Sequence, residues 1–179
     1  MLKKIIAKLF ASFVVRQIES TYSKAAKIQK QTLIKLIKKA SKTQFGLDHN
    51  FKNINDFKSF KSLVPVRDYE DIKSYIDKVK KGEENILWPG KPRYFAKTSG
   101  TTSGAKLIPI SNESMLHHIK SSRNALLFYI NKTGKTDFLS GKTIFIQGSP
   151  ILKNINGIKT GRLSGIVAHY VPSYLRSNN

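Results

Sequence analysis

The amino-acid sequence predicts an α/β fold, in which a helical N-terminal segment precedes a mixed sheet with packed helices. Apolar residues recur at helical spacing through residues 1–42 and again in the middle of the chain. Three short apolar runs are typical of strands and lie at residues 93–97, 107–110 and 143–146. We therefore divide the chain into a helical segment, residues 1–50, and an α/β segment, residues 51–179.

Residues 1–20 predict an amphipathic helix with a basic start. Its apolar stripe comprises Ile5, Ile6, Leu9, Phe10, Phe13 and Val14. Lys8 interrupts the apolar core that a signal peptide needs, and the stretch is too short to cross a bilayer. Two interpretations remain. The default is a helix docked on its own domain, and the alternative is a cationic helix that contacts a membrane surface.

A second helix is expected through residues 21–42, with one apolar side and one lysine-rich side that is either solvated or binds phosphates. Gly46 is expected to mark its C-terminal stop. The residues expected to be buried are Ile28, Leu33, Ile34, Leu36, Ile37 and Ala40.

Two short helices are expected within residues 51–81. Asn53 or Asn55 is the expected N-cap of the first, and Pro65 ends it because the residue before a proline avoids helical dihedrals. The acidic cluster of Asp68, Glu70 and Asp71 suits the N-terminus of the second helix, with paired catalytic carboxylates as the alternative.

The next segment predicts two strands joined by a loop and followed by a helix. Residues 93–97 enter the loop and residues 107–110 leave it. Ser111 or Asn112 caps a helix that runs to about residue 133 and ends at Gly134. Further on, residues 143–146 form a continuous apolar run suited to a buried parallel strand. The last local signal is a hairpin turn at residues 154–157.

The loop itself is the most distinctive stretch of the chain. Its first seven residues are all Ser, Thr or Gly, and a lysine follows shortly after them. Glycines allow the backbone to approach a ligand closely, successive N–H groups can point at one anion, and the lysine supplies a charge for phosphate. The spacing is not that of a Walker loop. The pattern predicts a polyphosphate clamp, with a flexible surface loop as the alternative. The candidate residues are Thr98, Ser99, Gly100, Thr101, Thr102, Ser103, Gly104 and Lys106.

The chain is strongly basic, with 32 Lys and Arg against 11 Asp and Glu and a formal net charge of +21. The excess is spread along the whole chain. The positive charge favours binding of anionic ligands, nucleic acid or anionic membranes. The alternative is that the lysines form an ordinary solvated surface. Signatures of helix-turn-helix, zinc-finger or aromatic RNA-binding domains are missing, so no specific nucleic-acid partner is expected.

The absence of cysteine and the spacing of the histidines argue against thiol chemistry and metal binding. The sequence contains no cysteine, which rules out disulfides and thiolate catalysis. The spacing of its four histidines does not match that of metal ligands, so no metal site is predicted in this chain. They are His49, His117, His118 and His169.

The order Thr-Ser-Gly-Thr-Thr-Ser-Gly-x-Lys-x-x-Pro resembles the phosphate-binding loop of adenylate-forming enzymes such as acyl-CoA synthetases, luciferases and peptide-synthetase adenylation domains. Further matches narrow the resemblance to the Gretchen Hagen family of acyl acid amido synthetases, over about residues 28–176. These matches are Phe45-Gly46, Val64-Pro65-Val66, Tyr69-Glu70, Gly82-Glu83, Trp88-Pro89-Gly90, Phe95-Ala96-Lys97 and Val171-Pro172-Ser173-Tyr174-Leu175.

The resemblance implies that the chain is the N-terminal part of the large domain of an adenylate-forming enzyme. The loop residues named above would then bind ATP phosphates, and Lys106 would act catalytically by offsetting the charge of the leaving group. Residues 161–165 would contribute to the acyl-substrate region, and the end of the predicted strand before Gly148 suits a ligand. The candidate substrate-pocket residues are therefore Gly148, Ser164 and Gly165.

The implied partners are a small carboxylic acid and an amine or amino acid, with ATP and Mg²⁺ as cofactors and the cytoplasm as the compartment. The family's Tyr-x-x-[Ser/Thr]-Glu segment and its ribose-binding Asp segment do not occur in this sequence. We therefore expect an N-terminal fragment that is inactive alone, with the metal ligand in a part of the enzyme outside it. The alternative is a non-catalytic basic module that binds nucleic acid or an anionic membrane.

Overall fold

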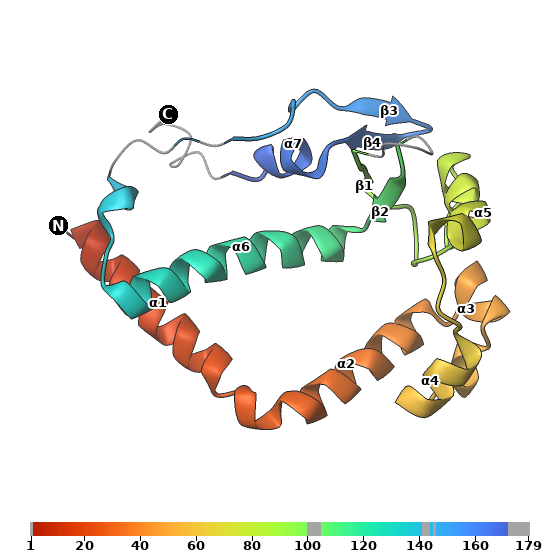
Figure 1. The fold of residues 1–179 in the computed structure, drawn as a ribbon, viewed down its shortest axis with the longest axis horizontal. Coiled ribbons are helices and arrows are strands. Elements are labelled where there is room, and N and C mark those ends of the chain that lie inside the picture. The colour runs from red at the N-terminus through yellow and green to blue at the C-terminus, as the bar shows by residue number, and fades with distance from the viewer. Residues whose placement is uncertain (1, 100–104, 141–143, 145, 172–179) are drawn as a thin grey trace.

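The computed structural model describes residues 2–99, 105–140, 144 and 146–171. It confirms the predicted class, because a helical N-terminal part is followed by a four-stranded mixed sheet with helices packed on it (Figure 1). The helices are α1 (Leu2–Glu19), α2 (Ala25–Ala40), α3 (Gln44–Asp48), α4 (Phe57–Leu63), α5 (Tyr69–Lys80), α6 (Asn112–Thr133) and α7 (Leu163–Ala168). The strands are β1 (Tyr94–Lys97), β2 (Leu107–Ile110), β3 (Lys153–Ile155) and β4 (Ile158–Gly161).

The strands of the sheet lie in the order β2-β1-β4-β3. β1 is antiparallel to β2 and parallel to β4, and β3 is antiparallel to β4. The predicted hairpin turn joins β3 to β4 through Asn156 and Gly157, which have φ angles of 48° and 85°. Two successive left-handed residues with an Asn-Gly sequence are the signature of a type I′ hairpin.

β1 is one of the two inner strands, and its first three residues are buried on both faces of the sheet. Successive side chains of a strand point to opposite faces, and the three buried side chains of β1 divide in this way. Phe95 is 0% exposed and packs with Ile76 and Val79 of α5. Tyr94 and Ala96 pack on the other side in a cluster that includes Met115 of α6 and Ile166 of α7. One face of the sheet is thus covered by α5 and the other by α6 and α7.

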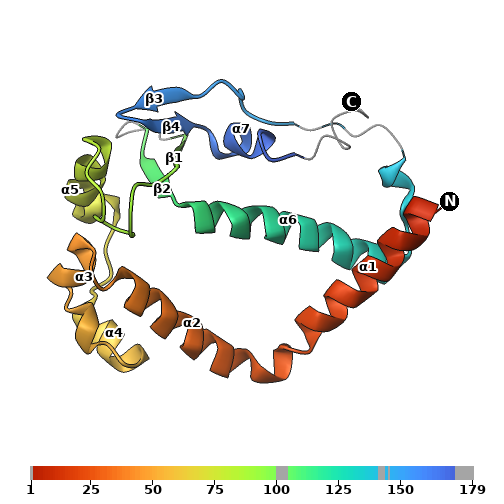
Figure 2. The same ribbon diagram turned by 180° about the vertical axis from the view of Figure 1, so that it is seen from behind.

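α1 lies across the C-terminal end of α6 in both ribbon views (Figures 1 and 2). Ala11 and Val14 of α1 pack with Leu127 and Ile130 of α6. The default interpretation of a docked helix is therefore confirmed, but the docked face is not the predicted stripe. Of that stripe only Val14 is buried, because the smaller residues on the opposite side of the helix make the contact with α6.

α2 also buries less of its apolar side than expected. Ile37 and Ala40 are buried, whereas Ile28 and Leu36 are 38% and 47% exposed. Gly46 does not stop this helix, which ends at Ala40, but lies inside α3. A Cβ atom on Gly46 would lie 2.1 Å from the carbonyl oxygen of Ala40, so the close approach of α3 to the end of α2 requires a glycine there.

Side chains that cap the helices fix where most of them begin. Asp68 caps α5 in a capping box with Asp71, which confirms the structural interpretation of that acidic cluster. The cap of α4 is Asp56, one residue beyond the nearer predicted asparagine. Ser111 caps α6, which ends as predicted at Gly134 in the left-handed conformation with φ 67°.

The predicted buried strand at residues 143–146 is wrong where the structure describes it. Ile144 and Ile146 lie outside any strand and are 88% and 98% exposed. None of the described strands pairs with them, so neither a hydrogen-bonded ladder nor a packed layer removes them from water. Thr143 and Phe145 lie outside the described residues.

A carboxylate at the start of α6 connects three separate segments. Glu113 forms an ion pair with Lys39 of α2 and accepts a hydrogen bond of 3.2 Å from the indole Nε1 of Trp88. The Lys39 ammonium also lies 5.5 Å from the centre of the Trp88 ring. These contacts connect the end of α2, the turn before β1 and the N-terminus of α6, where the helix dipole favours a negative charge.

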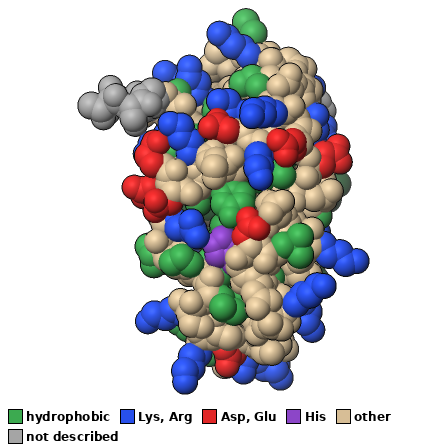
Figure 3. Space-filling view, turned by 90° about the vertical axis from the view of Figure 1, so that its right-hand side faces the viewer, with side chains coloured by type: hydrophobic (Ala, Val, Ile, Leu, Met, Phe, Trp, Pro, Cys, Tyr) green, Lys and Arg blue, Asp and Glu red, His purple; other side chains and the backbone are tan. Residues whose placement is uncertain are grey.

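Positive and negative charges are mixed on one face of the molecule. On the face formed by α3, α4 and α5, acidic side chains are interspersed with basic ones (Figure 3). This face therefore lacks the uniform basic surface that is typical of nucleic-acid-binding domains.

We predict that Phe95→Ala lowers the free energy of unfolding by about 3–5 kcal/mol, because it opens a cavity between the sheet and α5. Phe57→Ala is the matched control, since Phe57 is 65% exposed and should change stability by less than about 0.5 kcal/mol. Urea denaturation of both variants measures the difference. Equal losses of unfolding free energy in the two variants would show that Phe95 stabilises the fold no more than an exposed phenylalanine does.

Glu113 makes the stability of the fold depend on pH. Its ion pair with Lys39, its own backbone N–H and the Trp88 indole hold the pKa of its carboxyl at about 2, below the usual 4.5. The carboxyl of Glu113 therefore binds a proton more readily in the unfolded chain than in the folded one. Its contribution to the free energy of unfolding is full above pH 4.5 and is lost as the pH falls toward 2.

We predict that Glu113→Gln removes this dependence and, at neutral pH, destabilises the chain by no more than about 1 kcal/mol, because solvent screens a half-exposed pair. Glu84→Gln is the control, since Glu84 is exposed and has no ion-pair partner among the described residues. Urea midpoints between pH 2 and 7 measure the effect. Parallel pH curves for the wild type and Glu113→Gln would contradict it.

Candidate functional site

The candidate loop joins β1 to β2 as predicted, and hydrogen bonds close its base. The N–H of Thr98 donates to the carbonyl oxygen of Lys106 at 3.0 Å. The N–H of Lys106 donates back to the Thr98 hydroxyl at 3.2 Å. Because these bonds extend the β1–β2 pairing by one step beyond Lys97 and Leu107, the two ends of the loop are held at a fixed separation.

Lys106 is held by an aromatic side chain from α5. Its ammonium lies 5.1 Å from the centre of the Tyr69 ring, a cation–π distance. The Tyr69 hydroxyl accepts a 3.0 Å hydrogen bond from the N–H of Leu107. Tyr69 therefore binds the residue after the lysine through its hydroxyl and the lysine itself through its ring. The sequence placed Tyr69 at a helix start and in one of the family matches, but nothing in its local pattern indicated this contact.

Only the two ends of the loop belong to the described residues. Thr98 and Ser99 are exposed, and Lys106 is half-buried. Gly100, Thr101, Thr102, Ser103 and Gly104 lie outside the described residues.

The parallel pairing of β1 and β4 brings a second segment to the same edge of the sheet. Ala96 is paired with Gly161, so the chain leaves both strands at their carboxyl ends side by side. Thr98 begins the loop two residues after Ala96, and Arg162 precedes α7 directly after Gly161. In α/β sheets this is the edge at which ligands bind, next to the carboxyl ends of the parallel strands.

The three candidate substrate residues lie together near this edge. The N–H of Gly148 donates to the Ser164 hydroxyl at 2.9 Å. A Cβ atom on Gly165 would lie 2.1 Å from the carbonyl oxygen of Ser149, so α7 begins in direct contact with this segment. Although Ile144 and Ile146 do not form the strand predicted before Gly148, Gly148 still contacts Ser164, the candidate residue at the start of α7. The stretch at 161–165 forms the end of β4 and the start of α7.

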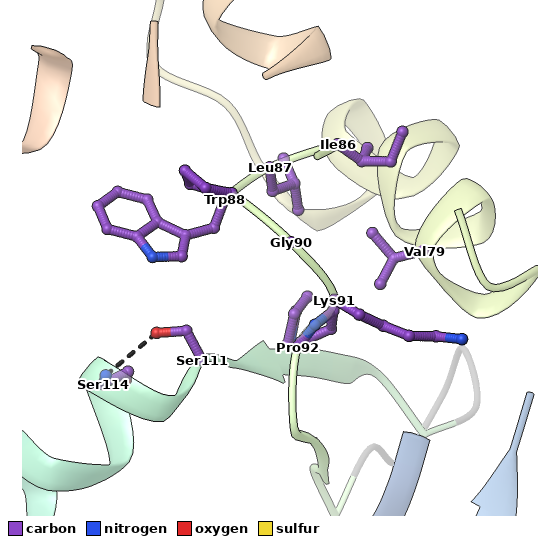
Figure 4. A pocket seen from close by; sticks show the side chains of 11 residues that line it. Val79, Ile86, Leu87, Trp88, Gly90, Lys91, Pro92, Ser111 and Ser114 are labelled. Carbon is purple, nitrogen blue, oxygen red and sulfur yellow. Dashed lines mark hydrogen bonds between the residues drawn. The ribbon is translucent and has the colours of Figure 1, made fainter. Parts of the chain in front are cut away.

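A pocket of about 250 Å³ lies between the Trp88 turn and the start of α6, and the sequence did not indicate it. Its walls are mainly apolar, with Ser111 and Ser114 at the start of α6 (Figure 4). The Ser111 hydroxyl accepts a hydrogen bond from the Ser114 N–H, and the remaining lining residues are Val79, Ile86, Leu87, Trp88, Pro89, Gly90, Lys91, Pro92 and Pro109.

The histidines do not form a metal centre. His49 is buried, with Nδ1 2.8 Å from the carbonyl oxygen of Phe45 and Nε2 2.9 Å from Arg67 Nη2. A carbonyl only accepts and a guanidinium only donates, so Nδ1 carries the proton and both ring nitrogens are used. Within the described ranges no group of three or more His, Asp or Glu side chains could hold a metal ion.

Comparison with known protein families matches residues 14–177 to the GH3 family N-terminal domain. The chain belongs to the GH3 family. This confirms the resemblance to the Gretchen Hagen acyl acid amido synthetases that the loop and its flanking motifs indicated.

Curated relatives are GH3 proteins of plants. The GH3 chain is 27% identical over 151 residues to a jasmonoyl–L-amino acid synthetase, JAR4, of Nicotiana attenuata, which covers 83% of this chain and 26% of the relative. It is 37% identical over 126 residues to the indole-3-acetic acid-amido synthetase GH3.15 of Arabidopsis thaliana, covering 68% of this chain and 20% of the relative.

A solved structure has the same fold. The GH3.15 acyl acid amido synthetase superposes with a TM-score of 0.73 at 25% identity, over 87% of the GH3 chain and 28% of the solved chain. The GH3 chain thus spans about a quarter of the length of the relatives it matches.

We predict that Ser164→Ala speeds hydrogen exchange of the Gly148 amide severalfold, because it deletes the acceptor of that N–H. Ser149→Ala is the matched control, since the Ser149 hydroxyl accepts instead from the N–H of Ile151. Exchange followed residue by residue by NMR distinguishes the two. An unchanged exchange rate of the Gly148 amide in Ser164→Ala would show that α7 does not hold Gly148 in the candidate substrate region.

Proposed function

We propose that this GH3 chain provides the ATP-phosphate loop and part of the acyl-substrate region of an acyl acid amido synthetase. In that reaction a carboxylate oxygen of the acid attacks the α-phosphate of ATP, and pyrophosphate leaves. The amine of an amino acid then attacks the acyl carbonyl, loses a proton and displaces AMP to form an amide. Because the acid is already ionised at neutral pH, the first step needs no general base.

The closed base of the loop and the fixed position of Lys106 are the observations that support this proposal. Thr98 and Lys106 hold the loop ends together, and Tyr69 holds the lysine beside them. A lysine kept at the entrance of a Ser/Thr/Gly loop can offset charge on the leaving phosphates without reorganising during the reaction. The proposed phosphate donors are the hydroxyls and N–H groups of residues 98–104.

The proposed acyl region follows from the shared edge of β1 and β4. Gly148, Ser164 and Gly165 lie beside the segment that leaves β4, next to the end of β1 from which the loop starts. A carboxylate bound there would lie at the same edge of the sheet as phosphates bound at the loop, and holding the two reactants close together promotes their reaction. The names of the relatives indicate jasmonate and indole-3-acetate as acids for those proteins, and for this chain we propose only the class of small carboxylic acids.

The described residues do not fit a metal site, since they contain no suitable group of His, Asp or Glu side chains. We therefore assign this part of the chain no role in holding Mg²⁺. Because the proposed reaction consumes ATP, we propose the cytoplasm as its location.

We predict that Lys106→Ala weakens binding of ATP and of pyrophosphate to the chain about tenfold or more, since a charged hydrogen bond contributes roughly 1.5–3 kcal/mol. Isothermal titration calorimetry measures both ligands. Pyrophosphate release at saturating acid is expected to fall wherever the complete activity can be assayed.

Lys97→Ala is the matched control. Lys97 is exposed at the end of β1, so its loss removes the same charge from the same edge without touching Tyr69. Its affinity for ATP should change much less than that of Lys106→Ala. Equal weakening by the two variants would indicate attraction by general charge and would contradict a specific role for Lys106.

A further inference from the structure

α1 carries two apolar faces on opposite sides of one helix. Residues 7, 11, 14, 15 and 18 follow helical spacing and point toward the rest of the protein, where the contact with α6 lies. Residues 2, 5, 6, 9 and 13 follow the same spacing about half a turn away. A helix that only docks on its own domain needs the first face and has no use for the second.

The second face is exposed along its whole length. We call it the outer face of α1, and it consists of Leu2, Ile5, Ile6, Leu9, Phe10 and Phe13. Leu2 and Leu9 are 70% and 67% exposed, and Phe13 is 58% exposed. Large apolar side chains that lie contiguously at a surface mark an interaction site in folded proteins.

Basic groups surround the outer face. Lys3, Lys8 and Arg16 are exposed on α1, and residues 2–18 contain no acidic residue. Arg123 of α6 lies 5.9 Å from the centre of the Phe10 ring and adds a further positive charge beside the same face. This combination of exposed Leu, Ile and Phe with Lys and Arg at the margin suits the interface of an anionic bilayer.

The outer face also precedes the residues that match the family model. The GH3 family match begins at residue 14, whereas every residue of the outer face precedes it. Of the α1 residues that pack on α6, Val14 falls within the match and Ala11 precedes it.

We propose that the outer face of α1 binds the surface of an anionic lipid bilayer, with the helix lying in the plane of the membrane. The helix has 18 residues and a length of about 27 Å, and it would insert only its six apolar side chains. Insertion across the bilayer is not part of the proposal, since among the described residues no helix is both long enough and apolar enough to span one.

The experiment is flotation of the full chain with vesicles of phosphatidylcholine alone and of phosphatidylcholine mixed with phosphatidylglycerol. Binding is expected only to the mixed vesicles, and it should weaken as salt is added because the basic margin attracts the lipid headgroups. The double variant Leu9→Gln/Phe13→Gln is expected to bind at least about tenfold more weakly, since two large side chains no longer leave water.

The matched control replaces the same residue types on other surfaces. Leu116 and Phe57 are 66% and 65% exposed, close to the values for Leu9 and Phe13, and lie on α6 and α4. Leu116→Gln/Phe57→Gln should bind vesicles like the wild type. Circular dichroism of both double variants checks that they fold, and the salt dependence of the wild type tests the proposal without any variant.

Three results would overturn the proposal. Equal binding of the two double variants would show that the net charge of the chain attracts the vesicles without the outer face. Equal binding to neutral and anionic vesicles would remove the role of the basic margin. Failure to float, together with a concentration-dependent dimer in sedimentation that Leu9→Gln/Phe13→Gln abolishes, would assign the face to a second copy of the chain.

Discussion

The burial of β1 on both faces is the constraint on which the rest of this structure depends. Phe95 requires α5 on one side, and Tyr94 and Ala96 require α6 and α7 on the other. A strand enclosed in this way must satisfy its hydrogen bonds laterally, which it does with β2 and β4. The same pairing decides that the loop after β1 and the segment after β4 leave the sheet at one edge.

That edge relates the fold to the chemistry proposed for it. The β1–β2 hairpin fixes where the loop begins and ends, and Tyr69 adds a contact from outside the sheet that holds Lys106 there. Gly148 reaches the same region through Ser164. Two kinds of observation meet here. Membership of the GH3 family rests on the whole length of the match, and the arrangement of these residues rests on local hydrogen bonds.

The helices place the two proposed binding functions far apart. α6 starts next to the sheet and ends under α1, and its 22 residues span about 33 Å. A bilayer at the outer face of α1 would therefore leave the loop and the acyl region clear of the lipid. The Glu113 contacts with Lys39 and Trp88 hold α2 and the turn before β1 to the first turn of α6.

The sequence alone determined the fold class, the β1–loop–β2 unit, the extent of α6, the β3–β4 turn and the family. The local elements follow from signals within a few residues of one another, such as a capping serine or an Asn-Gly pair. The fold class and the family follow from the order of patterns and motifs along the chain. Other features needed the tertiary structure, because they depend on partners distant along the chain. Periodicity identified the apolar residues of α1 but not the face that α6 would bury, and it predicted a strand at Ile144 and Ile146 that no described strand pairs with. The contact between Tyr69 and Lys106 joins residues far apart in sequence, so only the packing of α5 against β2 could place them together.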